Sequence, residues 1–282
     1  MGLAFNFGMV RVGQFALRGL KAAAVAYCLV LLVLLYLENM LVYPAPRYPE
    51  GDWQATWLKH EDVDFRSADG TRLHAWYVEH SQPQAVVLYC HGNGTHVPDL
   101  AQFLAAMRDE FQVSIFAFDY RGYGKSEGQP EENGILEDAE AAQDWLARRA
   151  GIEKQNIVLM GRSLGGGIAL HLAAENGARG VILQNTFTSL PDAAAHHYPW
   201  APIRLLMKNR YDSLSRISRY SGPIFLSHGT ADRIVPFAHG QKLFAAATGP
   251  KEFFEITGGD HNDSEPEHYV PALHKFLDSL PK

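Results

Sequence analysis

Short apolar runs alternate with amphipathic stretches from about residue 61 to the end of the chain. The apolar runs predict buried strands at residues 85–90, 113–118, 157–160, 181–184, 223–227 and 252–256. Apolar residues at helical spacing between these runs predict helices at residues 97–110, 131–150, 166–176, 237–247 and 267–280. Strands that alternate with helices in this way form a mostly parallel sheet with helices on both faces.

Two stretches depart from this alternation. Residues 61–66 and 72–79 read as strands joined by a turn that contains Gly70, which predicts an antiparallel hairpin ahead of the parallel strands. Residues 190–222 contain three prolines and short helical pieces between two predicted strands. We interpret this insertion as a small cap over a cleft, with a long connection as the alternative.

The longest apolar run lies near the N-terminus. Residues 22–37 carry no charged side chain, and the segment from about residue 20 to residue 43 reaches the ~20 residues that a membrane-spanning helix needs. Basic residues precede the run and Glu38 follows it. The positive-inside rule therefore predicts a single-pass membrane protein with a cytoplasmic N-terminus and its folded domain on the non-cytoplasmic side. A cleaved signal peptide or a buried core helix is the alternative.

The predicted organisation has three parts. Residues 1–43 contain the transmembrane helix, residues 44–60 form a proline-rich linker, and residues 61–282 form one α/β domain. The chain has 25 Lys and Arg against 31 Asp and Glu, a net charge of −6, and no basic stripe, which argues against a nucleic-acid partner. The only two cysteines, Cys28 and Cys90, lie in the apolar N-terminal run and in a predicted strand, so we expect no disulfide between them.

A Gly-x-Ser-x-Gly sequence follows the predicted strand 157–160. It consists of Gly161, Ser163 and Gly165 with one residue in each gap, and a predicted helix comes directly after it. A serine on such a strand-to-helix turn has strained backbone and a hydroxyl presented to a cleft, and the glycines avoid collisions within the turn. The backbone N–H of Leu164 and the positive end of the helix would face negative charge that develops during acyl transfer. The pattern predicts Ser163 as a nucleophile; a glycine-rich turn without chemistry is the alternative.

A serine nucleophile needs a general base and an acid that orients the base. Asp232 follows the predicted strand 223–227, and His261 follows the strand 252–256 after a Gly-Gly turn. The chain order Ser163, Asp232, His261 is the order of an α/β-hydrolase triad. Asp260 is a rival acid, but side chains of adjacent residues on an extended loop tend to diverge.

The loop after the strand 85–90 contains His91, Asn93 and two glycines. We expect the backbone N–H of Asn93 to join that of Leu164 in an oxyanion hole, and we expect His91 to pack rather than to act as the base. The pair His196 and His197 has no second ligand pair at a suitable spacing, so no metal site is predicted. The loop 119–126 is glycine-rich and contains Lys125, but it lacks the Walker spacing for phosphate. We interpret that loop as a rigid turn braced by Asp119 and Arg121.

Several of these motifs occur together in one known family. In this order the motifs are His91-Gly92-Asn93-Gly94, Asp119-Tyr120-Arg121-Gly122-Tyr123-Gly124-Lys125-Ser126, Gly161-Arg162-Ser163-Leu164-Gly165-Gly166, His228-Gly229-Thr230-Ala231-Asp232 and Asp260-His261. From about Glu61 to its end the chain resembles the membrane-anchored α/β-hydrolases of the Bem46-like group, as does its apolar N-terminal segment. The resemblance implies an eight-stranded α/β-hydrolase core and a triad of Ser163, Asp232 and His261. The chain departs from the group after Asn93, which leaves Gly94 as the alternative second oxyanion donor.

The sequence favours a membrane-anchored serine hydrolase that cleaves carboxylic esters or thioesters without a metal or an organic cofactor. Its expected partners are a small-molecule or lipid-like substrate and the membrane. Cleavage of amides or peptides by the same triad is one alternative. A membrane-tethered binding protein of hydrolase fold, without turnover, is the other.

Overall fold

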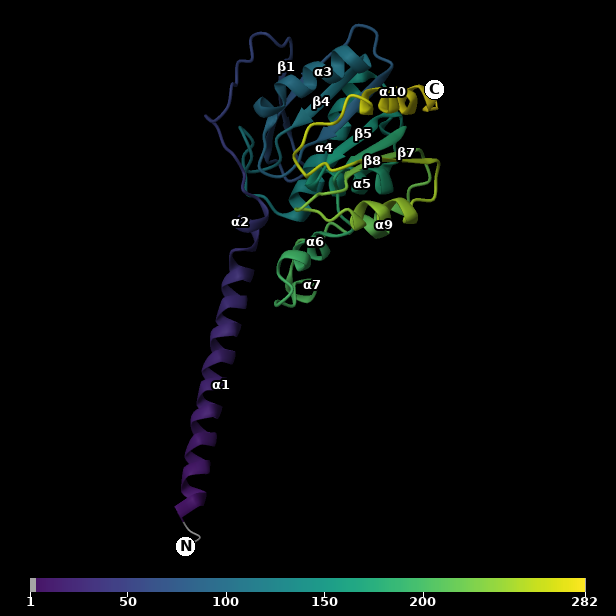
Figure 1. Cartoon of the computed structure of the whole chain (residues 1–282). Helices are drawn as coiled ribbons and strands as arrows, with labels where there is room; N and C mark the ends of the chain where they lie inside the picture. The colour runs from purple at the N-terminus through teal and green to yellow at the C-terminus, as the bar shows by residue number, and fades with distance from the viewer. Residues whose placement is uncertain (1–3, 282) are drawn as a thin grey trace. The chain divides into compact units, whose positions relative to one another are not determined.

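A computed structural model describes residues 4–281 of the chain, which divide into two compact units between Val42 and Tyr43. In the first unit α1 spans Ala4–Tyr36 and α2 spans Glu38–Val42 (Figure 1). Leu17–Tyr36 is long and apolar enough to cross a membrane, with a mean hydropathy of 2.1 and no buried residue. A signal sequence would pass the same test, so the helix is a candidate for either.

The second unit contains one eight-stranded sheet with the order β1-β2-β4-β3-β5-β6-β7-β8. Its strands are β1 Glu61–Arg66, β2 Arg72–Val78, β3 Ala85–Cys90, β4 Val113–Phe118, β5 Val158–Arg162, β6 Gly180–Gln184, β7 Ile224–Gly229 and β8 Lys251–Ile256. β1 and β2 pair antiparallel, β2 pairs antiparallel with β4, and all later pairs are parallel. The predicted mostly parallel sheet, with its antiparallel hairpin at one edge, is confirmed.

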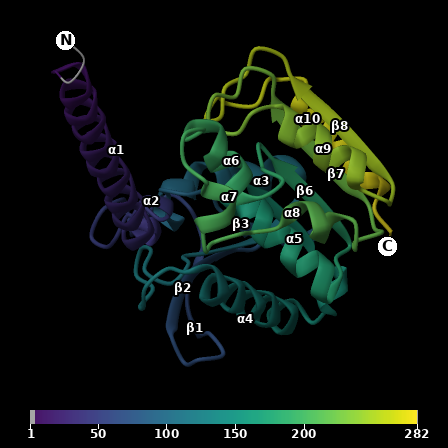
Figure 2. The same ribbon diagram turned by 90° about the horizontal axis from the view of Figure 1, so that it is seen from below.

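Helices cover both faces of this sheet. On one face α3 (Ala101–Phe111) and α10 (Tyr269–Ser279) enclose the main apolar core against the strands, and a short 3₁₀ turn, η1 (Val97–Leu100), precedes α3. α4 (Glu132–Ala150), α5 (Leu164–Asn176) and α9 (Ala238–Ala246) lie on the other face, which Figure 2 shows from below. Because both faces are covered, β3 and β4 are almost wholly buried, which explains their uninterrupted apolar sequences.

The insertion between β6 and β7 contains three short helices: α6 Leu190–His197, α7 Ile203–Leu206 and α8 Ser213–Ile217. We call residues 190–222 the cap. α6 and α7 lie outside the helices that cover the sheet (Figure 1), whereas α8 packs against α5 and α9. The backbone N–H of Leu190 donates to the carbonyl of Arg210 at 2.9 Å, and that of Leu214 donates to the carbonyl of Thr188 at 2.9 Å. The two ends of the protruding part therefore meet.

The proline-rich residues that follow the N-terminal unit belong to the second compact unit. Gly124 N–H donates to the carbonyl of Pro46 at 2.8 Å, and Tyr48 N–H donates to the carbonyl of Gly124 at 3.1 Å. The buried Tyr43 hydroxyl donates to Asn209 Oδ1 at 2.7 Å and lies 3.0 Å from the Tyr211 hydroxyl. The domain thus holds the first residues of this segment by hydrogen bonds.

Candidate active site

The turn between β5 and α5 holds Ser163 in a strained backbone conformation. Its φ is +52° and its ψ is −117°, and a positive φ is rare for a residue with a side chain. The Ser163 N–H donates to the carbonyl of Gln184 at 2.9 Å, and the Thr186 hydroxyl donates to the carbonyl of Ser163 at 2.8 Å. A backbone bond to the end of β6 and a side-chain bond from Thr186 therefore hold both backbone groups of the strained residue.

The two glycines of the Gly-x-Ser-x-Gly sequence are required by space. A Cβ on Gly161 would lie 2.2 Å from the carbonyl oxygen of Gly165. A Cβ on Gly165 would lie 1.9 Å from the carbonyl oxygen of Cys90, at the end of β3. α5 begins at Leu164, two residues earlier than the helix predicted from residue 166, because the turn enters the helix directly. Leu164 N–H is therefore in the first helical turn, where amide groups have no partner within the helix.

Asp232 and His261 come together from loops after two neighbouring strands, β7 and β8. His261 Nδ1 lies 2.7 Å from Asp232 Oδ2, and both side chains are buried. The other carboxylate oxygen, Asp232 Oδ1, accepts hydrogen bonds from the backbone N–H groups of Ile234 and Val235, each at 2.8 Å. The carboxylate is thus fixed in position and directed at one ring nitrogen of the histidine.

A second histidine contacts the same carboxylate. His228 Nε2 donates to the carbonyl of Val235 at 2.8 Å and lies 3.4 Å from Asp232 Oδ2. Burial would raise the pKa of Asp232, but hydrogen bonds from His228 and His261 outweigh it and hold the pKa well below its usual value. Asp232 therefore stays an anion wherever the protein is folded at ordinary pH.

The backbone of His261 is joined to the residue before the serine. Arg162 Nη2 donates to the carbonyl of His261 at 2.8 Å, and Asn185 Nδ2 donates to the same carbonyl at 2.9 Å. The loop after β8 is thereby fixed beside the turn that carries Ser163. Within residues 4–281 the Ser163 hydroxyl has no hydrogen bond of its own in this structure. Such bonds in hydrolases without substrate are often long and tighten only when substrate binds.

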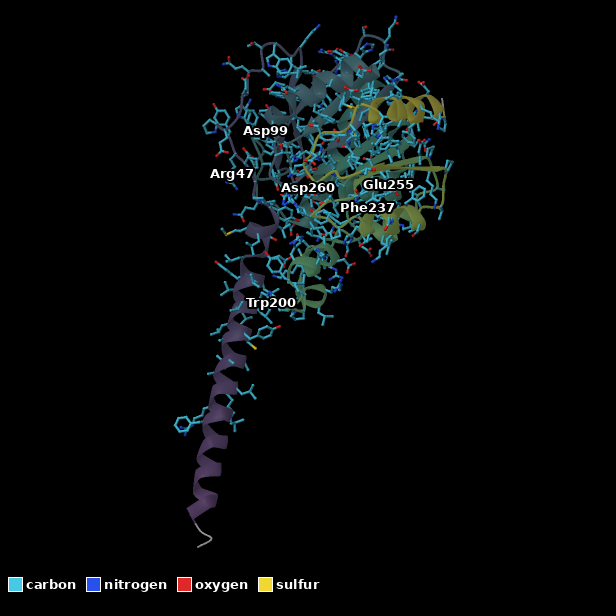
Figure 3. All side chains as sticks on the ribbon, viewed as in Figure 1. Arg47, Asp99, Trp200, Phe237, Glu255 and Asp260 are labelled. Atoms are coloured by element: carbon cyan, nitrogen blue, oxygen red, sulfur yellow. The ribbon has the colours of Figure 1, made fainter. Side chains whose placement is uncertain are left out.

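Asp260 is occupied by a different partner. Its carboxylate accepts from the Arg233 N–H at 3.0 Å, from Arg233 Nε at 2.7 Å and from the backbone N–H of His261 at 2.8 Å. These bonds, above all those from Arg233, lower the pKa of Asp260 to about 2. Figure 3 labels Asp260 in the loop after β8. The carboxylate contacts the backbone of His261 rather than its ring, so Asp260 orders this loop.

The loop after β3 lies beside Ser163. A Cβ placed on Gly92 would lie 3.8 Å from Ser163 Cβ. Asn93 Oδ1 accepts from the Tyr123 hydroxyl at 2.7 Å and from the Gly94 N–H at 3.1 Å. The Gly94 N–H therefore already donates to the side chain of Asn93.

His91 has a packing role, as predicted. Its ring is fully buried and stacks on Tyr120 with 3.9 Å between centroids, and its Nδ1 lies 2.8 Å from the carbonyl of Gly92. Burial lowers the pKa of His91, which keeps the ring neutral. The Tyr120 hydroxyl donates to the carbonyl of His91 at 2.7 Å, so the pair fixes the end of β3.

The loop 119–126 is a brace. Asp119 Oδ1 accepts from the Val97 N–H at 2.9 Å, and Oδ2 lies 3.1 Å from His74 Nδ1. Arg121 forms an ion pair with the buried Asp138 at 2.7 Å. Lys125 lies over the Trp53 ring at 4.7 Å. Asp119 and Arg121, which we expected to brace the turn, thus bond to neighbouring segments of the domain.

Sequence reasoning missed four residues that support the site: Arg162, Asn185, His228 and Tyr123. Arg162, Asn185 and Tyr123 bond to loops beside the predicted triad, whereas His228 contacts the Asp232 carboxylate itself. Arg162, Tyr123 and His228 stand within the quoted motifs, and His228 also ends a strand four residues before Asp232. The sequence assigned none of them a contact with the site. Within the described residues no cluster of three metal-ligating side chains occurs.

Comparisons with known proteins identify the family. A family model described as "Serine aminopeptidase, S33" matches residues 81–211. The Mycobacterium tuberculosis protein Rv2307c is 36% identical over 221 residues, which cover 77% of this chain and 78% of the relative. The Arabidopsis thaliana "Alpha/beta hydrolase domain-containing protein WAV2" is 32% identical over 228 residues, which cover 73% of this chain and 74% of the relative. The chain belongs to the α/β-hydrolase superfamily.

Solved structures agree with this assignment at the level of the fold. The Pyrococcus furiosus esterase Pf2001 matches the hydrolase with a TM-score of 0.70 at 18% identity, over 84% of the hydrolase and 96% of the esterase chain. The acetyl xylan esterase from Paenibacillus sp. R4 matches with a TM-score of 0.64 at 18% identity, over 86% of the hydrolase and 99% of that chain. The α/β-hydrolase fold expected from the motifs is confirmed.

Proposed function

We propose that the hydrolase cleaves carboxylic esters or thioesters through an acyl-enzyme on Ser163, and that its N-terminal helix anchors it in a membrane. The observation that carries this proposal is the 2.7 Å contact between His261 Nδ1 and Asp232 Oδ2, in a loop bonded to the residue before Ser163. Membership of the superfamily and the fold shared with two esterases support it. Within the superfamily, the motifs and the apolar N-terminal helix favour the Bem46-like group.

The proposed reaction has two halves. Ser163 Oγ attacks the substrate carbonyl while His261 Nε2 takes the hydroxyl proton, and Asp232 stabilises the resulting imidazolium. The N–H groups of Leu164 and Asn93 stabilise the oxyanion of the tetrahedral intermediate. His261 then returns the proton to the leaving alcohol or thiol, and the C–O or C–S bond breaks. Water, deprotonated by His261, attacks the acyl-enzyme and releases the acid and Ser163.

The N-terminal helix supports the proposed location. Leu17–Tyr36 satisfies the length and hydropathy of a membrane span, and basic residues precede it while Glu38 follows. The proposed topology is a single pass with the N-terminus in the cytoplasm and the α/β domain on the other side.

A fluorophosphonate probe tests the nucleophile. We expect the hydrolase to be labelled and Ser163→Ala to lose labelling and ester hydrolysis, with a fall in kcat/KM of ~10³-fold or more. Ser221→Ala, which alters an exposed serine at the end of the cap, serves as the matched control and should label like the natural protein. Equal labelling of Ser163→Ala and the natural protein would remove the assignment and would leave the binding-protein alternative.

The family description favours amide cleavage as a second candidate, because it names a serine aminopeptidase. Acyl esters, acyl thioesters and aminoacyl amides of matched acyl groups separate the two. We expect esters and thioesters to be cleaved at the higher kcat/KM, since the leaving alcohol or thiol needs less protonation than an amine. A higher kcat/KM for the amides would replace the esterase proposal with the peptidase one.

A further inference from the structure

The cap exposes large apolar side chains. Between residues 43 and 281 seven large apolar side chains are exposed, and four of them, Tyr198, Trp200, Leu205 and Leu214, lie in the cap. Leu205 is 85% exposed and Trp200 is 51% exposed. Figure 3 labels Trp200 on the cap, outside the body of the sheet and its helices. Large apolar side chains that gather on one exposed segment indicate an interaction site.

Basic residues accompany the apolar ones. The cap contains five Lys and Arg against two Asp, whereas the whole chain has a net charge of −6. Arg204, Lys208 and Arg210 are exposed, and all three lie within five residues of Leu205. The Arg204 side chain stays 65% exposed although it pairs with Asp192. Aromatic and aliphatic side chains interleaved with Lys and Arg are typical of a surface that rests on anionic lipid.

The cap is also the part of the domain at which the N-terminal segment is attached. Tyr43 is the first residue of the second unit and is bonded covalently to Val42. Its hydroxyl is held by Asn209 and Tyr211, at the end of the protruding part of the cap. The chain therefore enters the domain at the base of the cap.

The cap is connected to the proposed catalytic loops. His197, at the end of α6, donates from Nε2 to the carbonyl of Ile234 at 2.8 Å. Ile234 is 49% exposed and follows Asp232 by two residues. The hydrogen bond of His197 therefore joins the cap to the loop that carries Asp232.

We infer that the lipid-facing surface, defined as Tyr198, Trp200, Arg204, Leu205, Lys208 and Arg210, docks on the anionic surface of the bilayer. This docking presents the site to ester or thioester lipids that stay in the membrane. The choice of membrane as the occupant rests on the proposed anchor, because a span that ends at Tyr36 is separated from Tyr43 by only six residues and so keeps the base of the cap close to lipid. Docking would add membrane contacts of the six side chains of the lipid-facing surface to the attachment that the N-terminal helix provides.

Tryptophan fluorescence tests the docking without any catalysis. The N-terminal 42 residues contain no tryptophan, so the emission of the full-length chain comes from the domain. The chain, carrying Ser163→Ala, is reconstituted in vesicles of phosphatidylcholine and phosphatidylglycerol with and without bromine on the acyl chains. We expect bromine to quench the emission, and we expect Trp200→Phe to lose roughly half or more of that quenching.

Trp57→Phe is the matched control. Trp57 is 57% exposed and lies outside the cap, so we expect this variant to keep the quenching of the parent chain. Quenching that is absent, or equal in the parent chain and Trp200→Phe, overturns the inference and leaves a protein partner or a second copy of the chain as the occupant. Because the nucleophile is already removed, this result is independent of the proposed reaction.

A second measurement connects docking to substrate. Leu205→Asp should lower the ratio of vesicle-ester hydrolysis to soluble short-chain ester hydrolysis by roughly tenfold. Circular dichroism of the same variant monitors folding. If Leu205→Asp leaves this ratio unchanged, the inference that docking presents membrane lipids to the site is overturned. If Ser163→Ala loses both activities but keeps the bromine quenching, docking and the proposed nucleophile are both supported.

Discussion

Asp232 is a charged residue whose side chain is removed from water. Its side chain is fully buried and contacts two histidines and two backbone N–H groups. A carboxylate held in this way keeps its charge to low pH, and its charge supports the ring that must become positive in the proposed reaction. We expect Asp232→Asn to reduce kcat/KM by ~10³- to 10⁴-fold while fluorophosphonate labelling becomes slow rather than absent. Rapid labelling by Asp232→Asn would contradict this role.

The depressed pKa of Asp232 also gives a pH dependence of stability. A carboxylate whose folded pKa is lowered contributes stability above its unfolded pKa, about 3.9, and loses it as pH falls through the folded value. The free energy of unfolding of the natural protein should therefore fall toward that of Asp232→Asn below pH about 4. Urea unfolding at neutral and acidic pH measures the difference. Asp64→Asn, which alters an exposed carboxylate of the hairpin, should show a much smaller change.

At the residue scale, the sequence proposed the triad residues but not the residues that hold their loops. Ser163, Asp232 and His261 could be named because each stands just after an apolar run, where parallel strands place their loops. Asn185 and Arg162 could not be named, because their part is to bond the backbone of His261, and such a bond depends on three-dimensional packing. The contact of His228 with Asp232 depends on a loop conformation that spacing alone does not define.

The β5–α5 turn is the element with least tolerance for change. Alanine at Gly165 would gain up to ~1 kcal/mol of helix propensity, but its Cβ would lie 1.9 Å from the Cys90 carbonyl oxygen. The nearest colliding atoms belong to the backbone of β3 and cannot move without disturbing the sheet, so we expect Gly165→Ala to destabilise the protein by about 3 kcal/mol or more. Gly92→Ala is the matched control, since its nearest neighbours would lie 3.7 and 3.8 Å away. Thermal unfolding compares the two, and equal midpoints would contradict the steric argument.

At the element scale, the apolar runs predicted the central strands almost residue for residue. β3 and β4 match their predicted ranges because they are buried on both faces and have no polar interruption. β5 extends two residues beyond its prediction because Gly161 and Arg162 still pair with β6 although neither is apolar. The cap helices could only be suggested, since α7 and α8 are four and five residues long and carry no repeat of a helical pattern.

For the whole molecule, the proposed location rests on the N-terminal helix. If the helix is an anchor, the protein extracted from membranes should retain residues 1–42. A protease added outside intact cells or spheroplasts should also cleave a C-terminal tag, because the proposed topology places the domain outside the cytoplasm. Mass spectrometry of the extracted protein checks the first point. A mature protein that begins beyond residue 36 would show instead that the helix is a signal sequence.

The meeting of the cap's two ends has a consequence for how such enzymes diversify. The backbone of Leu190 bonds to that of Arg210, and the backbone of Leu214 bonds to that of Thr188. The chain therefore leaves the domain and re-enters it at adjacent points, with about twenty residues between them. A segment closed in this way can be exchanged for another of different length without reopening the sheet or displacing the three loops that follow β5, β7 and β8. The length and composition of the cap can therefore change while the loops of the proposed active site stay in place.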